Sequence, residues 1–198
     1  MGRFAGLTGL VQTGHVVGQL FDVLVGQLGG NHLHDAQFTG LGGVIHALLL
    51  GRDIIVARPR APVHLNMYVI LVSESGIMRK STSIRVATSL VRGFLQQSQR
   101  PTLLIESKVT AGMVLNELSL ATRKHDTAQM VLVASELAAV LGRGSSISGL
   151  PALLTDLYDC PDVRSGGGSL NTGEFNFKNV YSSFLGGSTP SWLAKAVR

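Results

Sequence analysis

Three consecutive residues, Lys80, Ser81 and Thr82, offer one ammonium group and two hydroxyls at the start of a helical pattern. A lysine at such a point can hold the outer phosphates of a nucleoside triphosphate, and the next hydroxyl can bind the accompanying Mg²⁺. The backbone N–H groups at a helix start also favour an anion. The alternative is a basic helix terminus after an ordinary turn, although a lysine there opposes the helix dipole. This segment therefore predicts a phosphate-binding loop.

The loop before Lys80 departs from the strict pattern G-x-x-x-x-G-K-[ST]. Glu74 and Arg79 stand where the two glycines belong, and Gly76 is the glycine that remains in the loop. A carboxylate at Glu74 would repel a triphosphate unless it turned outward. We expect Lys80 to act in catalysis as well as binding and Ser81 to be the Mg²⁺ ligand. The predicted nucleotide-binding residues are Ser75, Gly76, Arg79, Lys80, Ser81 and Thr82.

A second candidate group follows the apolar run 130–134, which ends at Ser135 and Glu136. A carboxylate at a strand tip can orient or activate a water molecule, or hold Mg²⁺ through water. The alternative is a surface glutamate that opens a helix, where the dipole favours it. The 56 positions between Lys80 and Glu136 leave room for one more strand and helix, which the pattern places at 102–123. We predict Glu136 as the second catalytic residue.

The third candidate group is Ser188 and Thr189, which follow a predicted strand at 180–185 and two glycines. Polar residues at the tip of a neighbouring strand can sense the γ-phosphate or the attacking water. The alternative is a simple cap for the helix that Pro190 begins.

The elements that position these groups alternate along the chain. A continuous apolar run at 67–72 predicts a buried parallel strand, and the helix from Lys80 to about Gln97 follows it. Thr110 is a suitable N-cap for the second helix. Strand, helix, strand, helix, strand is the pattern of a parallel sheet with crossover helices. Further expected elements are strands at 53–57, 102–106, 130–134 and 180–185, helices at 150–158 and 190–197, a short helix ending at Gly142, and a tight turn between antiparallel strands at 165–169.

Composition narrows the class of protein. The chain has 198 residues, of which 15% are charged, too few for a disordered chain or a coiled coil. Cys160 is the only cysteine, which excludes an internal disulfide framework and fits a reducing, cytoplasmic setting. The net charge of +5 and the pI near 9.8 favour polyanionic partners. The longest uncharged stretch near the start, 4–21, is too polar to span a membrane.

The first quarter of the chain differs in composition from the rest. Twelve glycines lie within residues 1–51, where Arg3, Asp22 and Asp35 are the charged residues. Apolar residues there recur with helical spacing, and the proline-containing segment 58–62 is a candidate boundary. We therefore expect a helical, glycine-rich N-terminal element at 1–62 and a core domain at 63–198.

The core resembles the P-loop NTPase domain of unknown function found in phage and mobile-element primase–helicase proteins. The resemblance covers roughly residues 40–198 and rests on five segments, 66–72, 79–82, 134–137, 153–159 and 186–192. In that family an Asn-x-Tyr strand leads into the loop, and Arg-Lys-Ser/Thr closes it. The resemblance implies an α/β, RecA-like fold with a mostly parallel sheet and flanking helices. Typical members continue past the sensor-like strand, so the core is expected to be incomplete at its C-terminus.

The resemblance also implies a function. We expect ATP binding and hydrolysis with Mg²⁺, coupled to DNA replication or unwinding, with single-stranded DNA as a partner. Such motors work as homo-oligomeric rings, and no membrane partner is expected. Two alternatives stay open: a degenerate, non-hydrolysing nucleotide-binding or assembly module, and a truncated fragment without independent activity.

Overall fold

The structure is a computed structural model, which describes residues 55–59, 62–75, 80–106, 109–141, 149–167 and 174–196. These residues belong to the unit Ala47–Arg198, one of two units into which the chain divides. Of the helical element expected at 1–62, residues 1–54, 60 and 61 lie outside the described residues.

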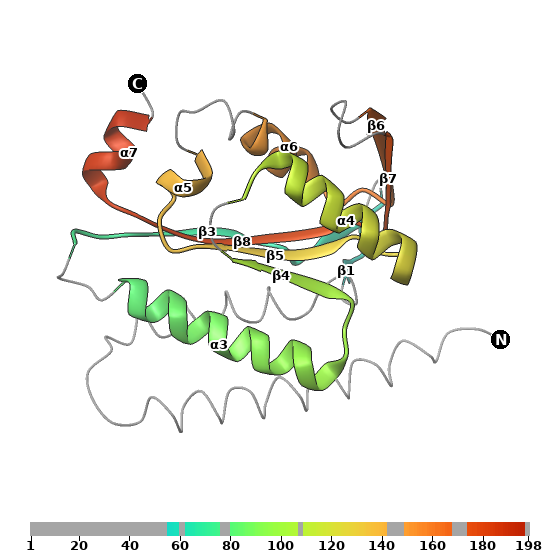
Figure 1. Cartoon of the computed structure of the whole chain (residues 1–198), viewed down its shortest axis with the longest axis horizontal. Coiled ribbons are helices and arrows are strands. Elements are labelled where there is room, and N and C mark those ends of the chain that lie inside the picture. Colours follow the sequence, from blue (N-terminus) through green and yellow to red (C-terminus); the bar gives the residue numbers. More distant parts are fainter. Residues whose placement is uncertain are drawn as a thin grey trace. The chain divides into compact units, whose positions relative to one another are not determined.

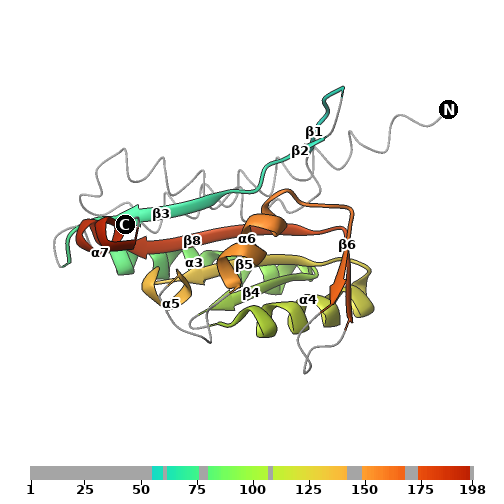
Figure 2. The ribbon, with the colours of Figure 1, turned by 90° about the horizontal axis from the view of Figure 1, so that it is seen from above.

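Four parallel strands form the central sheet: β3 (Tyr68–Val72), β4 (Thr102–Glu106), β5 (Gln129–Ala134) and β8 (Tyr181–Ser188). Their order across the sheet is β3-β8-β5-β4, so the first two strands of the sheet in chain order lie at its opposite edges (Figure 2). Each neighbouring pair is parallel. The predicted α/β class with a parallel sheet and flanking helices is confirmed.

Helices cover both faces of this sheet (Figure 1). The long helix α3 (Lys80–Ser98) lies on one face, and α4 (Ala111–His125) and α6 (Leu150–Tyr158) lie on the other. The short helices α5 (Ala138–Leu141) and α7 (Pro190–Ala196) stand at the end where the strands terminate. The strand tips are therefore surrounded by the start of α3, by α5 and by α7.

Local sequence signals explain where α4 begins and ends. The Thr110 hydroxyl accepts a hydrogen bond from the Met113 N–H (3.2 Å), as predicted for an N-cap. Asp126 ends the helix in the left-handed conformation, with φ at 55°. Three basic residues in the last turn complement the negative end of the helix dipole.

The helix α3 packs through one apolar face. Ile84, Ala87 and Val91 are buried, and Thr88 joins them with its hydroxyl donating to the Ile84 carbonyl (2.7 Å). The burial thus follows the predicted helical spacing. It fixes the first turn of α3, and with it Lys80, against the sheet.

The prediction that β3 is a buried strand was wrong. Ile70 and Val72 are 40% and 46% exposed, because β3 has β8 as its single neighbour among the described strands and forms an edge of this sheet. By contrast, all eight residues of β8 are buried, since it has a neighbour on each side. An uninterrupted apolar run is compatible with either position, and only the strand order separates them.

Two glycine-rich segments lie in strands beyond the predicted bounds. The strand predicted at 180–185 continues through two more glycines, and part of the turn predicted at 165–169 lies within a strand. Gly186 and Gly187 belong to β8, and Ser165 and Gly166 belong to β6 (Val163–Gly167), which pairs antiparallel with β7 (Glu174–Lys178). In both cases the glycine makes room for a neighbour: a Cβ on Gly166 would lie 2.8 Å from the Phe175 ring on the paired strand.

Two shorter strands precede the central sheet in the chain. The expected strand at 53–57 is present as β1 (Ile55–Val56), which pairs antiparallel with β2 (Val63–His64). The segment 58–62, expected to be a boundary, connects these two paired strands.

The core lies mainly between β5, β8 and the helices α4 and α6, with Tyr181, Phe177 and Leu118 among its largest fully buried side chains. Two of the buried hydroxyls on β8 have partners in the edge strand or in the residue before it. The Ser183 hydroxyl accepts from the Met67 N–H (3.2 Å), and Ser182 lies 2.8 Å from the Tyr68 hydroxyl. These bonds attach β3 to β8 and set the register of the strand that leads to Lys80.

Candidate functional site

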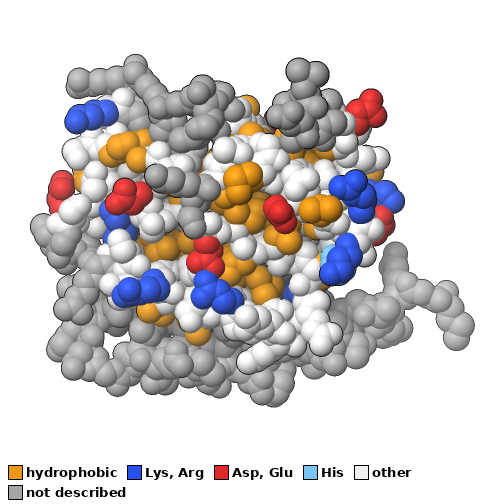
Figure 3. Space-filling view, in the orientation of Figure 1, with side chains coloured by type: hydrophobic (Ala, Val, Ile, Leu, Met, Phe, Trp, Pro, Cys, Tyr) orange, Lys and Arg blue, Asp and Glu red, His pale blue; other side chains and the backbone are white. Residues whose placement is uncertain are grey.

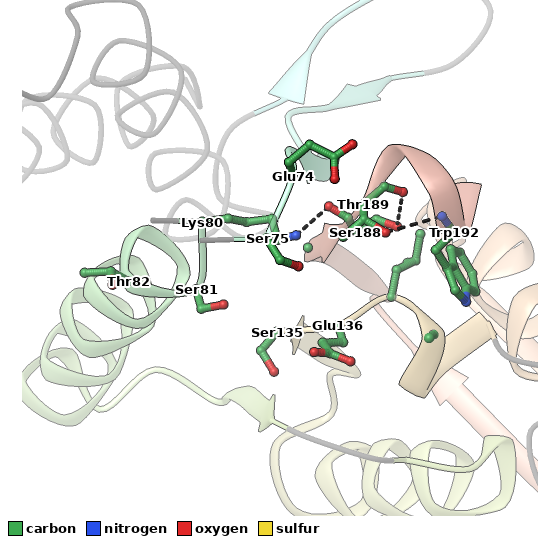
Figure 4. A pocket seen from close by; sticks show the side chains of 13 residues that line it. Glu74, Ser75, Lys80, Ser81, Thr82, Ser135, Glu136, Ser188, Thr189 and Trp192 are labelled. Atoms are coloured by element: carbon green, nitrogen blue, oxygen red, sulfur yellow. Dashed lines mark hydrogen bonds between the residues drawn. The ribbon is translucent and has the colours of Figure 1, made fainter. Parts of the chain in front are cut away.

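A cavity of about 370 Å³ opens at the carboxyl ends of the strands (Figure 4). In parallel α/β sheets this is the edge where ligands bind. The cavity gathers residues from the tips of β3, β5 and β8 and from the starts of α3, α5 and α7. The lining residues are Glu74, Ser75, Lys80, Ser81, Thr82, Ser135, Glu136, Leu137, Ala138, Gly187, Ser188, Thr189 and Trp192.

Lys80 is the first residue of α3, and its ammonium group is held by backbone carbonyls. Its Nζ donates to the Ser188 carbonyl at 2.5 Å and to the Ser73 carbonyl at 3.4 Å. The Ser188 carbonyl also accepts from the Ser73 N–H (3.2 Å). The carbonyls offset the unfavourable position of a cation at a helix N-terminus, and they hold Lys80 between the tips of β3 and β8.

The two hydroxyls after Lys80 point in different directions. The Ser81 side chain points toward the side of the cavity where Ser135 and Glu136 lie, whereas Thr82 points away from them (Figure 4). Both residues are exposed. Ser81 is thus the better placed of the two to bind a ligand or its metal.

The turn after β5 carries Ser135 and Glu136, both exposed at the cavity. The turn is tied to β8 because the Leu137 N–H donates to the Gly187 carbonyl at 2.6 Å. Gly187 is also a point of close approach, since a Cβ there would lie 2.6 Å from the Ser135 carbonyl oxygen. The position of Glu136 therefore depends on a backbone contact that only glycine permits.

The two predicted sensor residues differ in exposure. Ser188 is 6% exposed, and its hydroxyl lies 3.4 Å from the Thr189 carbonyl. The Thr189 hydroxyl is half-buried, accepts from the Trp192 N–H (3.3 Å) and lies 3.1 Å from the Ser191 hydroxyl. Hence Ser188 contacts Lys80 through its backbone carbonyl, and Thr189 caps α7 in addition to lining the cavity.

The structure brings together most of the residues predicted from the sequence. Ser75, Lys80, Ser81, Thr82, Glu136, Ser188 and Thr189 all line the cavity, and Gly76 and Arg79 lie outside the described residues. Six lining residues were not among the predicted site residues: Glu74, Ser135, Leu137, Ala138, Gly187 and Trp192. Each lies within three positions of a predicted residue in the chain, so proximity along the chain was the available signal.

The described lining residues carry one cation, Lys80, and two carboxylates, Glu74 and Glu136. Their net charge is therefore −1, which does not suit a bare polyanion. In the described part of the chain, no group of three or more His, Cys, Asp or Glu side chains could hold a metal ion. A Mg²⁺ ion fits this donor set if a hydroxyl such as that of Ser81 is one of its ligands. Oxygens of a bound ligand and of water molecules would then complete its coordination.

In comparisons with family models, curated proteins and solved structures, no match to this chain was found. Across the described residues, no helix is long and apolar enough to cross a membrane.

Proposed function

We propose that the protein binds and hydrolyses a nucleoside triphosphate, ATP, at this cavity. One observation carries the proposal: groups that the sequence spreads over more than a hundred positions line a single cavity at the carboxyl edge of a parallel sheet. They are the lysine and hydroxyl that start α3, the carboxylate after β5 and the hydroxyls at the end of β8.

Each group has a role that its chemistry suits. Lys80 would exchange its bonds to backbone carbonyls for bonds to the β- and γ-phosphates, and Ser81 would ligate Mg²⁺. The metal ion would neutralise charge that develops on the phosphates. Ser75 and the backbone N–H groups at the start of α3 would also contact the phosphates.

The carboxylate of Glu136 would orient or activate the attacking water. This residue is exposed and lines the cavity. Thr189, which is half-buried at the cavity, and Ser188 would respond to the γ-phosphate. Ser135 stands beside Glu136, where many enzymes of this class have an aspartate, so Mg²⁺ would rely on Ser81 and the phosphates.

The strand order supports a RecA-like P-loop assignment. In the order β3-β8-β5-β4, β8 separates the strand that leads to Lys80 from the strand that leads to Glu136. A ligand can then lie across the tip of β8, between the lysine and the carboxylate. The resemblance adds DNA replication or unwinding as the process served, a homo-oligomeric ring as the working form, and single-stranded DNA as a partner. The net charge of +5 is compatible with that partner, and the single cysteine is compatible with a cytoplasmic setting.

A second candidate function is that of a non-hydrolysing nucleotide-binding or assembly module. It is favoured by Glu74, which lines the cavity and adds a negative charge where a glycine is usual. This charge would lower the affinity of the cavity for a triphosphate.

Calorimetry with Mg-ATP tests the proposal. The wild type should bind, and Lys80→Ala should bind roughly 10- to 150-fold more weakly, the effect of losing a charged hydrogen bond of about 1.5–3 kcal/mol. Lys195→Ala is the matched control, because this exposed lysine does not line the cavity. If a folded wild type binds no Mg-ATP, the ATPase proposal and the nucleotide-binding module both fail, and an assembly module or a fragment without independent activity is left.

The variant Glu136→Gln separates the two candidates. For an ATPase it should keep the affinity for Mg-ATP and lower turnover by about 10²- to 10⁴-fold, as expected when a general base is removed. A wild type that binds Mg-ATP but shows no turnover, alone or with single-stranded DNA, supports the non-hydrolysing module instead.

A further inference from the structure

Trp192 is the only tryptophan of the chain, and it lines the same cavity as Lys80. Its side chain is half-buried and packs partly against the core. Its backbone N–H is fixed by the Thr189 hydroxyl (3.3 Å). The indole is therefore anchored on one side while part of it faces the cavity.

The cavity has two chemically different sides. Lys80 and Ser81 lie on one side and Trp192 lies on the other, with Glu136 between them (Figure 4). The apolar side chains of the lining, Leu137, Ala138 and Trp192, come from the start of α5 and from α7. A ligand that fills the cavity would meet polar groups at one end and a flat aromatic surface at the other.

We propose that Trp192 is a stacking platform for a nucleobase. Every nucleobase offers a flat π-surface, and stacking on an aromatic side chain is tolerant of sequence. The base has two possible sources: a nucleotide bound in the cavity, or a single strand of nucleic acid that reaches its mouth. Lys195, which is exposed and lies three positions after Trp192 on α7, can contact a backbone phosphate of such a strand.

If the base belongs to a nucleotide bound in the cavity, the stacking proposal rests on the proposed function. If the base belongs to a single strand of nucleic acid, it does not. The first experiment follows the fluorescence of Trp192, which reports on one site because the chain has no other tryptophan. Three probes are titrated with Mg²⁺: inorganic tripolyphosphate, the non-hydrolysable adenosine (β,γ-imido)triphosphate, and a single-stranded oligothymidylate. Calorimetry on the same samples measures binding itself.

Quenching by the adenosine compound but not by tripolyphosphate assigns the base to the nucleotide. Quenching by oligothymidylate assigns it to a strand. No quenching by either base-containing probe, or equal quenching by tripolyphosphate, would overturn the stacking proposal. Failure of the proposed function looks different, because then neither triphosphate compound produces heat of binding.

Variants separate stacking from packing. Trp192→Ala should weaken binding of the base-containing probe by roughly 5- to 150-fold, the loss of one base–aromatic stack, and leave tripolyphosphate affinity unchanged. Trp192→Phe, which keeps an aromatic ring, should recover most of the affinity. Tyr158→Ala is the matched control, because Tyr158 is 46% exposed on α6 but does not line the cavity. An equal loss for the base-containing probe and for tripolyphosphate in Trp192→Ala would show a structural role only.

Discussion

Gly187 and Ser135 approach each other so closely that a Cβ added to the glycine would lie 2.6 Å from the serine carbonyl oxygen. The same Cβ would lie 3.0 Å from Ile84 Cδ1 and 3.3 Å from Lys80 Cδ. The start of α3, the turn after β5 and the end of β8 therefore meet at one glycine. This contact sets the spacing between the lysine and the carboxylate of the cavity.

The first prediction concerns this contact. Gly187→Ala should destabilise the protein by about 1–3 kcal/mol, because the backbone of the Ser135 turn must move to admit a methyl group. It should also weaken Mg-ATP binding, since Lys80 and Glu136 lose their relative positions. Urea unfolding and calorimetry measure the two effects.

The matched control is Gly93→Ala in α3, where an added Cβ meets nothing within 4 Å. This change should stabilise the protein by about 0.5–1 kcal/mol, because alanine favours a helix more than glycine does. Equal stabilities of the Gly187→Ala variant and the wild type would contradict the tight contact.

A second prediction follows from the charge of the cavity. With two carboxylates and one ammonium group in its described lining, ATP binding itself should require Mg²⁺. Chelating the metal with EDTA should lower affinity about ten-fold or more, which corresponds to about 1.4 kcal/mol. Calorimetry with and without EDTA measures this, and Glu74→Gln should reduce the difference. Unchanged affinity in EDTA would rule out this account of the site.

A third prediction concerns stability at high pH. Burial raises the pKa of Tyr181 to about 12 and raises that of Tyr68 well above its usual range, partly offset by hydrogen bonds with Ser183 and Ser182 respectively. Both tyrosines ionise more readily in the unfolded chain, near pH 10. The stability that they contribute is therefore present below pH 10 and is lost as the pH rises from 10 toward 12.

Urea unfolding between pH 8 and 11.5 tests this expectation. The free energy of unfolding should fall above pH 10, by at most about 1.4 kcal/mol per pH unit for each tyrosine. Tyr181→Phe should remove its share of the slope. A slope that is the same in this variant and in the wild type would assign the alkaline loss to other groups.

The fourth prediction concerns the N-cap of α4. Thr110→Ala removes the acceptor for the Met113 N–H and should cost about 1 kcal/mol of stability. Thr155→Ala is the control, since its exposed hydroxyl donates within α6 to the Pro151 carbonyl (3.0 Å) and caps no helix end. Urea unfolding of both variants decides the matter: if Thr155→Ala costs as much as Thr110→Ala, the cap has no special role.

Much of the fold could be predicted from the sequence because its signals are local. The N-cap at Thr110, the apolar face of α3 and the buried run at 130–134 depend on residues a few positions apart, and all three are confirmed. The grouping of Lys80, Ser81 and Glu136 was also predicted, because parallel strands bring their carboxyl ends to one edge.

The sequence by itself determined the alternation of strands and helices and indicated the candidate residues for phosphate binding, since both depend on residue type and short spacing. Only the tertiary structure decided the strand order, which makes β3 an exposed edge and buries β8 at the centre. It also decided that Gly187 belongs to a strand and that Trp192 forms a wall of the cavity. These features depend on contacts between segments fifty or more positions apart. Such contacts do not produce a periodic pattern in the sequence, so they could not be predicted from it.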